Sequence, residues 1–267
     1  MLTPLGVGHQ RSGSLLLKTG QTTQYSSELD DGFYEMGVAK SYTINTTGAQ
    51  TGTTNVDLTH LISDTGAFTA GDQTYTDVGK CGVFKAAGGE VIIITGSGSN
   101  DGTYTSVSAD ADTLVVTVGF VNEPNAPETT FKKREAISNN TVFDLRTRLT
   151  WMRYISAKMG ILGNGRMPWT GQVYDIFQYC AVANAASLGG QTDWRIPNIL
   201  EYISIMDFEA PTAFPDAVAF PAWAANNFSS TTRVDTITDA LYPRYNIGLL
   251  ANVVKTGISY CGLVRGG

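Results

Sequence analysis

The sequence is poor in charge and in the residues that usually hold metals. Only 16% of its 267 residues are charged, and the formal net charge is −6, whereas about a quarter of an average soluble domain is charged. No basic run is present, so we expect no nucleic-acid partner, because such a partner needs a basic footprint. The only histidines are His9 and His60, which argues against a zinc site or a His-dependent catalytic triad.

Cysteines and long apolar runs are also scarce. The three cysteines, Cys81, Cys180 and Cys261, form no CxxC pair and show no metal-binding spacing. No stretch approaches the length of a membrane span, so no membrane partner is expected. The first twenty residues lack the apolar centre of a secretory signal and are interrupted by Arg11. If the protein acts outside a cell, release inside a virus particle by lysis would explain how it arrives there.

The polar residues that are present indicate a β-rich chain. Thr, Ser, Asn, Gln and Gly must supply the polar surface, as in many extracellular and virion proteins. Three runs rich in Val, Ile and Thr, at 91–95, 104–107 and 114–120, are separated by polar turns and predict a small antiparallel module. The turn-rich segment 122–130 marks the exit from this module.

Helical periodicity is confined to one window of about forty residues. Apolar residues recur at helical spacing in 169–187, and Gly189-Gly190 ends that helix. A second helix is predicted at 198–207, after Pro197. The segment 139–156 favours a pair of strands or one strand with a bend. Two helices between β regions predict an α+β domain.

An ordered set of short motifs carries a resemblance to a known family. The sequence contains "YC" (179–180), "GGQTDWRIP" (189–197), "SST" (229–231) and a terminal "VRGG" (264–267). Over about 140–267 this pattern resembles the C-terminal domain of the Lcl collagen-like adhesins. The segment 19–37 resembles the family's usual leading segment. The family is similar in fold to C-type lectins and formylglycine-generating enzymes, and several members are phage proteins or variable proteins of diversity-generating retroelements.

The resemblance implies an α+β, C-type-lectin-like domain, made of two helices and a curled antiparallel sheet, with a small all-β inserted module. We therefore expect an N-terminal anchoring segment at 1–80, part of which joins the lectin-like domain. The β module would occupy 81–135 and the C-type-lectin-like domain 136–267.

The same resemblance assigns structural roles to the corner between the helices. Asp193 and Arg195 would form a buried pair, and Trp194 would pack in the core. Cys180 and Cys261 would face one another, either as a disulfide or as two neighbouring buried thiols. A bridge would close a loop of about 80 residues and stabilise the fold by about 4–5 kcal/mol, whereas thiols are favoured in a reducing cytosol.

A ligand-binding face is predicted in the segment 223–260. In the variable-protein relatives the corresponding segment presents exposed side chains to the target. A mixture of Tyr, Arg and Asn suits adaptable recognition, although a solvated face is the alternative. The candidate ligand-binding residues are Arg233, Asp235, Thr238, Tyr242, Arg244, Asn246 and Asn252.

Two other groups of residues suggest calcium, and neither leads us to predict a cofactor. The tripeptide 123–125, Glu-Pro-Asn, holds calcium and sugar in some C-type lectins, but here it precedes the helices and fits a strand-exit turn better. Asp207, Glu209 and Asp216 could supply oxygen ligands. Solvation of a helix end and loop is the commoner reason for such a group. We predict no metal site.

The sequence thus predicts a phage virion surface protein that binds a host-cell glycan or protein without catalysis, at a tail fibre tip or on the capsid. It would contact other virion subunits and form a homo-oligomer, with a trimer favoured. One alternative is a structural capsid-decoration or tail component with no receptor role. Another is an enzyme of the formylglycine-generating type, which needs a reactive cysteine in a cleft.

Overall fold

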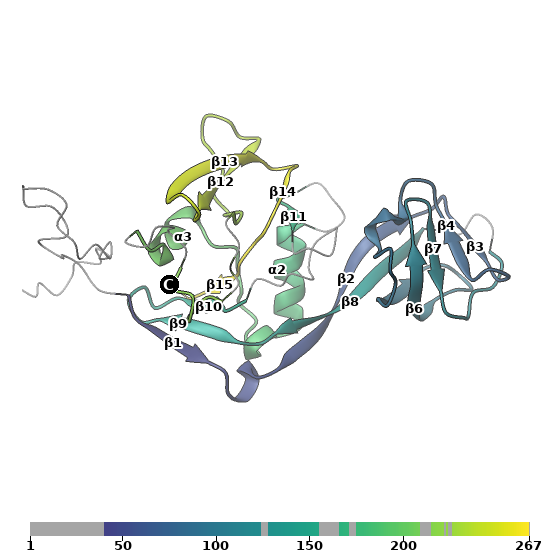
Figure 1. The fold of residues 1–267 in the computed structure, drawn as a ribbon, viewed down its shortest axis with the longest axis horizontal. Coiled ribbons are helices and arrows are strands. Elements are labelled where there is room, and N and C mark those ends of the chain that lie inside the picture. The colour runs from purple at the N-terminus through teal and green to yellow at the C-terminus, as the bar shows by residue number, and fades with distance from the viewer. Residues whose placement is uncertain are drawn as a thin grey trace, which may run out of the picture.

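The computed structural model consists of two lobes joined by a long β ribbon (Figure 1). It describes residues 40–123, 128–154, 166–170, 175–208, 215–221, 223 and 226–266. The segment 19–37, which resembles the family's leading segment, lies outside the described residues.

One lobe is built on a seven-stranded antiparallel sheet with the order β2-β8-β5-β6-β7-β4-β3. The sheet curls around its own core, because the rings of Phe68 in β3 and Phe131 in β8 are 6.1 Å apart although these strands lie near opposite edges. The strands are β2 (Thr53–Ser63), β3 (Ala67–Thr69), β4 (Thr74–Thr76), β5 (Val91–Thr95), β6 (Gly102–Ala109), β7 (Thr113–Val116) and β8 (Thr129–Ser138).

The expected strands of the β module are present, and earlier strands join them. The predicted strand 91–95 is β5, and 104–107 lies within β6. The third ends at Val116 instead of Phe120, and Gly119 beyond it has a φ of 115°, outside the strand region. Strands β2, β3 and β4 precede residue 81 but belong to the same sheet.

The ribbon of β2 and β8 contributes to the cores of both lobes. Leu58 faces α2 (Ile176–Ala185) and packs in the C-terminal lobe, whereas Leu61 packs in the β lobe. Residues three apart in a regular strand point to opposite faces. The register shift between Thr59 and Leu61 is a β-bulge that places both leucines on the same face. One continuous face of the ribbon therefore serves two cores.

The C-terminal lobe contains short strands divided among several small sheets. Its four-stranded sheet has the order β1-β9-β10-β15, and two-stranded pairs form from β11 with β14 and from β12 with β13. The predicted strand pair in 139–156 is present as β9 and β10. The strands are β1 (Tyr42–Asn45), β9 (Thr141–Asp144), β10 (Thr150–Met152), β11 (Met167–Pro168), β12 (Asp239–Arg244), β13 (Leu249–Val254), β14 (Ile258–Ser259) and β15 (Val264–Arg265).

Both α-helices of the described chain have side-chain caps. Asp175 accepts hydrogen bonds from the first turn of α2. Asn198 and Glu201 form a capping box at the start of α3 (Ile199–Ile205). Three 3-10 turns, η1 (Gly48–Gln50), η2 (Cys81–Val83) and η3 (Leu188–Gly190), complete the elements. None of the helices in the described ranges is both long and apolar enough to cross a bilayer.

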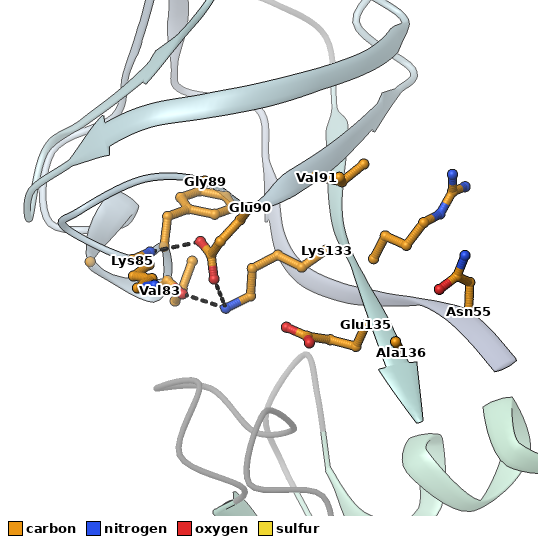
Figure 2. Close-up of a pocket in the computed structure, with 12 residues that line it drawn as sticks. Asn55, Val83, Lys85, Gly89, Glu90, Val91, Lys133, Glu135 and Ala136 are labelled. Carbon is orange, nitrogen blue, oxygen red and sulfur yellow. Dashed lines mark hydrogen bonds and ion pairs between the residues drawn. The ribbon is translucent and has the colours of Figure 1, made fainter. Parts of the chain in front are cut away.

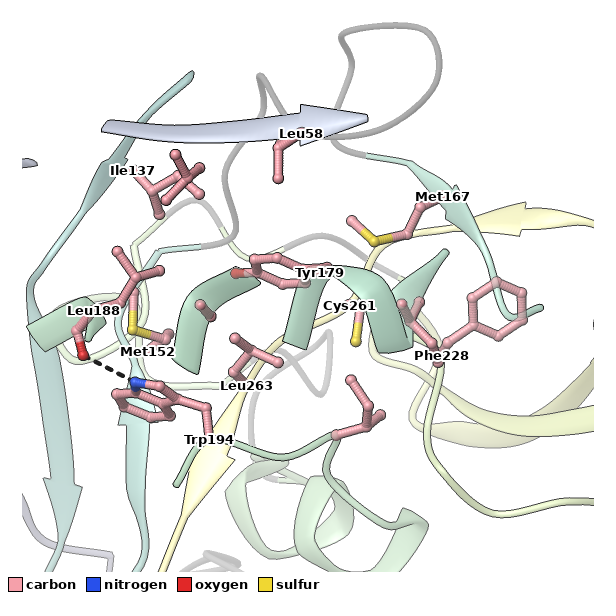
Figure 3. Close-up of a cluster of buried hydrophobic side chains, with 14 of the residues drawn as sticks. Leu58, Ile137, Met152, Met167, Tyr179, Leu188, Trp194, Phe228, Cys261 and Leu263 are labelled. Atoms are coloured by element: carbon pink, nitrogen blue, oxygen red, sulfur yellow. Dashed lines mark hydrogen bonds between the residues drawn. The ribbon is translucent and has the colours of Figure 1, made fainter. Parts of the chain in front are cut away.

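Two hydrophobic clusters fill the C-terminal lobe. Figure 3 shows the first, in which Tyr179 of α2 lies among side chains from the ribbon, the corner and the chain end, including Leu58, Trp194 and Leu263. The second is aromatic, with the rings of Trp151 and Trp223 5.8 Å apart.

The predicted fold class is wrong. The described chain is mostly β, with 40% strand and 13% helix, and its several sheets do not form a C-type-lectin-like α+β fold. The helices are shorter than predicted: α2 covers Ile176–Ala185 within the predicted 169–187, of which 171–174 lie outside the described residues. The strands of two to six residues in the C-terminal lobe are divided among several small sheets instead of joining one curled sheet.

Candidate functional site

The corner after α2 requires both of its glycines. Gly189 and Gly190 have φ values of 60° and 73°, in the left-handed region that favours glycine. A Cβ on Gly189 would lie 3.0 Å from the backbone oxygen of Asn139, and one on Gly190 would lie 2.7 Å from Cβ of Ala49. The chain thus reverses against η1 and the start of β9.

Trp194 lies in the core and is clamped by Asn184 from the last turn of α2. Its side chain is 2% exposed, and its Nε1 donates to the Leu188 oxygen at 2.9 Å (Figure 3). The backbone nitrogen of Trp194 donates to Asn184 Oδ1 at 2.6 Å, and Asn184 Nδ2 donates to the Trp194 oxygen at 2.8 Å. The sequence analysis did not identify Asn184, although a polar residue in the last turn of a predicted helix could have indicated a capping or clamping role.

Asp193 and Arg195 do not form the buried pair that was predicted. Asp193 is exposed and accepts from Nε of Arg265 at 2.6 Å, and this hydrogen bond lowers the pKa of Asp193. Arg195 instead pairs with Glu201 through Nη1 and Oε2 at 2.7 Å, and it also donates to the Gly266 oxygen. The reason is the chain end: β15 pairs with Arg195 through Val264 and so brings Arg265 beside Asp193.

Cys180 and Cys261 are both free thiols in the structure. Cys180 Sγ donates to the Trp194 oxygen at 3.0 Å, and Cys261 Sγ donates to the Gly262 oxygen at 3.2 Å. Burial raises the pKa of Cys180 to about 11 and raises that of Cys261 well above its ordinary value. A reactive cysteine needs a lowered pKa, whereas the pKa of both of these thiols is raised.

The β12–β13 hairpin divides the predicted ligand-binding residues between its two faces. Tyr242 and Arg244 are two residues apart in β12 and point to one side, because strand side chains alternate. Asn252 is paired with Leu241 in the ladder and therefore points to the other side. Asn246 lies in the turn between the strands. No single flat surface includes all four.

Arg233, Asp235 and Thr238 lie together in the loop before β12. Arg233 donates from Nε to Asp235 Oδ1 at 2.5 Å and from Nη2 to Oδ2 at 2.7 Å, and this pairing lowers the pKa of Asp235. The Thr238 oxygen accepts from the backbone nitrogen of Lys255 at 2.8 Å, which fixes the loop to the end of β13. The six residues of β12 span roughly 20 Å, so this loop and the turn at Asn246 lie far apart.

Exposed apolar side chains flank these polar residues, and sequence reasoning overlooked them. Val234 and Ile237 of the loop are 95% and 75% exposed, and Leu250 and Val254 of β13 are 49% and 51% exposed. Grouped apolar exposure on a polar surface is typical of an interaction site. The signal was available in the run "LLANVV" at 249–254, which contains no charge.

The base that carries the loop and hairpin is held by a tryptophan and a lysine. Lys255 Nζ lies 4.1 Å from the ring centroid of Trp169, a cation–π contact, and donates to Thr232 Oγ1 at 2.8 Å. Trp169 Nε1 donates to the Ser229 oxygen at 2.8 Å. These contacts join Trp169, just after β11, to the segment 229–232 before the loop and to Lys255 just after β13, so the exposed residues project from a braced support.

The family model described as the Lcl C-terminal domain matches residues 140–265. We name this part of the chain the Lcl C-terminal domain after this similarity. The match begins at β9 and ends in β15, so it includes the corner at Trp194, the loop 233–238 and the hairpin. The family match suggests a role like that of phage surface proteins and variable surface proteins, related to adhesion. No curated protein and no solved structure matches the chain.

A pocket of about 610 Å³ lies outside the Lcl C-terminal domain, between η2 and the strands β2, β5 and β8 (Figure 2). Its size suits a small ligand. Lys133, which is 1% exposed, donates to Glu90 Oε1 at 3.2 Å and to the Val83 oxygen at 3.1 Å. Because lysine and glutamate neutralise each other, this pair chiefly ties the η2 segment to β8.

The acidic residues considered for calcium that the structure describes have protein partners. Asp207 pairs with Lys40 at 3.1 Å just after α3, and Asp216 Oδ1 accepts two backbone hydrogen bonds in the following turn. Glu123 accepts from Asn100 Nδ2 at 2.7 Å in the β lobe. Glu209, Pro124 and Asn125 lie outside the described residues. In the part of the chain that the structure describes, no group of three or more His, Cys, Asp or Glu residues could hold a metal ion.

Proposed function

We propose that the protein is a phage virion surface protein that attaches without catalysis to a host-cell surface glycan or protein. Attachment uses the target face, defined as the loop 233–238 with the exposed sides of the β12–β13 hairpin. The observation that carries the proposal is this loop within the Lcl C-terminal domain, where exposed polar and apolar side chains project from a braced base.

The chemistry of the loop suits non-covalent recognition. Arg233 and Asp235 hold each other in a bidentate pair, so a donor and an acceptor group are preorganised side by side. Val234 and Ile237 supply apolar area next to them. Sugar hydroxyls and peptide groups both offer donors and acceptors to such a pair, and binding at the apolar residues removes them from water.

In this proposal the remainder of the protein belongs to the particle. The β lobe and the N-terminal segment anchor the Lcl C-terminal domain to other virion subunits, and copies of the chain associate with one another. The protein reaches the outside of the cell in the virion, after lysis.

The apolar exposure of β13 also supports a second candidate, a structural capsid-decoration or tail component. In that case Leu250 and Val254 are covered by a neighbouring subunit, and the loop 233–238 has no receptor to bind. The two candidates differ in whether changes in the loop alter attachment to cells.

The test is binding of the fluorescently labelled full-length chain to a panel of intact bacteria, with Arg233→Ala as the variant. Arg134→Ala is the matched control, since Arg134 makes a similarly exposed bidentate pair with Asp57 on the ribbon. We expect wild type and Arg134→Ala to bind one or more strains with the same affinity. Arg233→Ala should bind about 5- to 30-fold more weakly, the cost of losing an interface anchor.

Two pretreatments of the cells identify the target class. Loss of binding after periodate oxidation indicates a glycan, and loss after protease treatment indicates a protein. Absence of binding to every strain, or equal affinities for Arg233→Ala and Arg134→Ala, contradicts the proposal.

A further inference from the structure

The outer edge of β13 is an open strand edge. Among the described residues β13 pairs only with β12, in a two-stranded sheet. In an antiparallel pair each strand directs alternate N–H and C=O groups toward its neighbour, so half of the groups of β13 point away from β12. This edge can accept another strand.

The sequence of β13 lacks the features that usually protect such an edge. Natural proteins place lysine, proline or a bulge on exposed edges to prevent pairing with other chains. The strand Leu249–Val254 reads LLANVV, with neither a charge nor a proline, and its pairing with β12 shows no register shift. By contrast, β12 contains Pro243 and Arg244.

Symmetry limits the registers that are possible for pairing with a second copy, and the apolar side chains favour one of them. A two-fold axis through an antiparallel pair must place a residue opposite its own copy, and the paired side chains stay on one face. With Asn252 on the axis, Leu250 lies opposite Val254 of the other copy, and this contact occurs twice. Ala251 lies opposite Val253 on the second face. With Ala251 on the axis, Leu250 would instead lie opposite Asn252.

The exposures agree with the register centred on Asn252. Leu250 and Val254 are about half exposed, and both point to the face that also carries Asn252. Each would cover the other's apolar surface, and aliphatic cross-strand pairs stabilise a sheet. No charged residue lies within either strand to oppose a like charge.

We propose that β13 pairs edge to edge with β13 of a second copy, with Asn252 opposite Asn252, to form a four-stranded sheet across a two-fold axis. The contact uses the strand edge and leaves the loop 233–238 free. It therefore brings two copies of this loop together on one dimer, which raises the avidity for a surface that carries many targets. A two-fold contact produces dimers, not the trimer that the sequence reading favoured.

A cysteine cross-link tests the register directly. Directly opposed residues have Cα atoms about 4.5–5.5 Å apart, within the range of about 4.4–6.8 Å that a disulfide spans. Asn252→Cys should therefore form a covalent dimer under mild oxidation. Thr256→Cys is the matched control, because it is also exposed but would lie roughly 25 Å from its own copy in this register. Wild type reports any contribution of the three native cysteines.

A charge-pair rescue tests the contact without cysteine chemistry. By sedimentation velocity of the full chain, wild type should be dimeric, whereas Leu250→Lys and Val254→Asp should each be monomeric. An equimolar mixture of the two variants should dimerise again, because lysine at 250 then faces aspartate at 254 in the mixed pair.

Each outcome decides the proposal. It is overturned if wild type is monomeric at about 100 µM, or if Asn252→Cys cross-links no faster than Thr256→Cys. Failure of the mixture to dimerise also overturns the register. Cell binding by Arg233→Ala is measured separately from dimerisation. A failure of the proposed dimer can therefore be distinguished from a failure of the proposed function.

Discussion

The side chain of Asn184 is expected to hold the corner between the helices, and Asn184→Ala measures its contribution. The substitution removes two hydrogen bonds to the backbone of Trp194, one of 2.6 Å to its nitrogen and one of 2.8 Å from its amide to the Trp194 oxygen. The oxygen retains Cys180 as a donor, but the nitrogen loses its acceptor. An ordinary hydrogen bond contributes about 1 kcal/mol, and an unsatisfied buried donor costs about 1–3 kcal/mol.

The expected loss is therefore about 2 kcal/mol in the free energy of unfolding. For a domain of this size, that corresponds to a decrease of roughly 4–8 °C in Tm. Urea unfolding followed by tryptophan fluorescence measures it as a lower midpoint with an unchanged slope.

Two further variants make the test of Asn184 specific. Asn184→Asp keeps an acceptor for the Trp194 nitrogen but loses the donor to the oxygen, so it should fall between wild type and Asn184→Ala. Asn246→Ala, at the exposed hairpin turn, should change the free energy of unfolding by less than about 0.5 kcal/mol. If Asn184→Ala is as stable as Asn246→Ala, the clamp does not have the role assigned to it.

Three other predictions follow from the corner, the pocket and the thiols. Gly189→Ala should destabilise by about 2 kcal/mol, since it combines a positive φ with close contacts, whereas Gly71→Ala, which has open space around its Cβ, should be near neutral in the same urea titration. Lys133→Met should lower the unfolding free energy by about 3 kcal/mol because it leaves Glu90 unpaired, and adding Glu90→Gln should recover part of that loss; purely additive effects would contradict the pairing. With a pKa of about 11, Cys180 should react slowly with iodoacetamide at pH 8 and faster as the pH rises toward 11 and thiolate forms, as followed by mass spectrometry. Rapid labelling at pH 8 would refute the raised pKa.

Local patterns predicted individual elements well. The strand 91–95 follows from a continuous run of Val and Ile that is bounded by polar turns, and the strand pair around 141–152 follows from apolar residues at alternate positions. Trp194 is in the core, and residues 140–265 match the family whose motifs the sequence carries.

Long-range pairing could not be read from the sequence. The partner of Asp193 is Arg265, 72 positions away, and only the docking of β15 beside the corner brings them together. The bulge after Thr59, which lets one ribbon serve two cores, also depends on tertiary packing. The α+β assignment was wrong because the short strands of the C-terminal lobe are divided among several small sheets, and nothing in their individual sequences determines which sheet each joins.

The predicted ligand-binding set shows the same limit. Arg233, Asp235 and Thr238 are neighbours along the chain and remain together in one loop. Tyr242 and Asn252 are separated by strand register, which places them on opposite faces of the hairpin. Apolar exposure at Val234 depends on where the loop points, so composition alone could not reveal it.

The most direct measurement of the central claim is a cryo-EM map of the assembled particle that contains this chain. The account predicts that the loop 233–238 points to solvent, at a fibre tip or on the capsid surface, while β13 lies against a second copy. A map in which that loop is buried against another virion subunit would contradict the account and favour a structural role for the Lcl C-terminal domain.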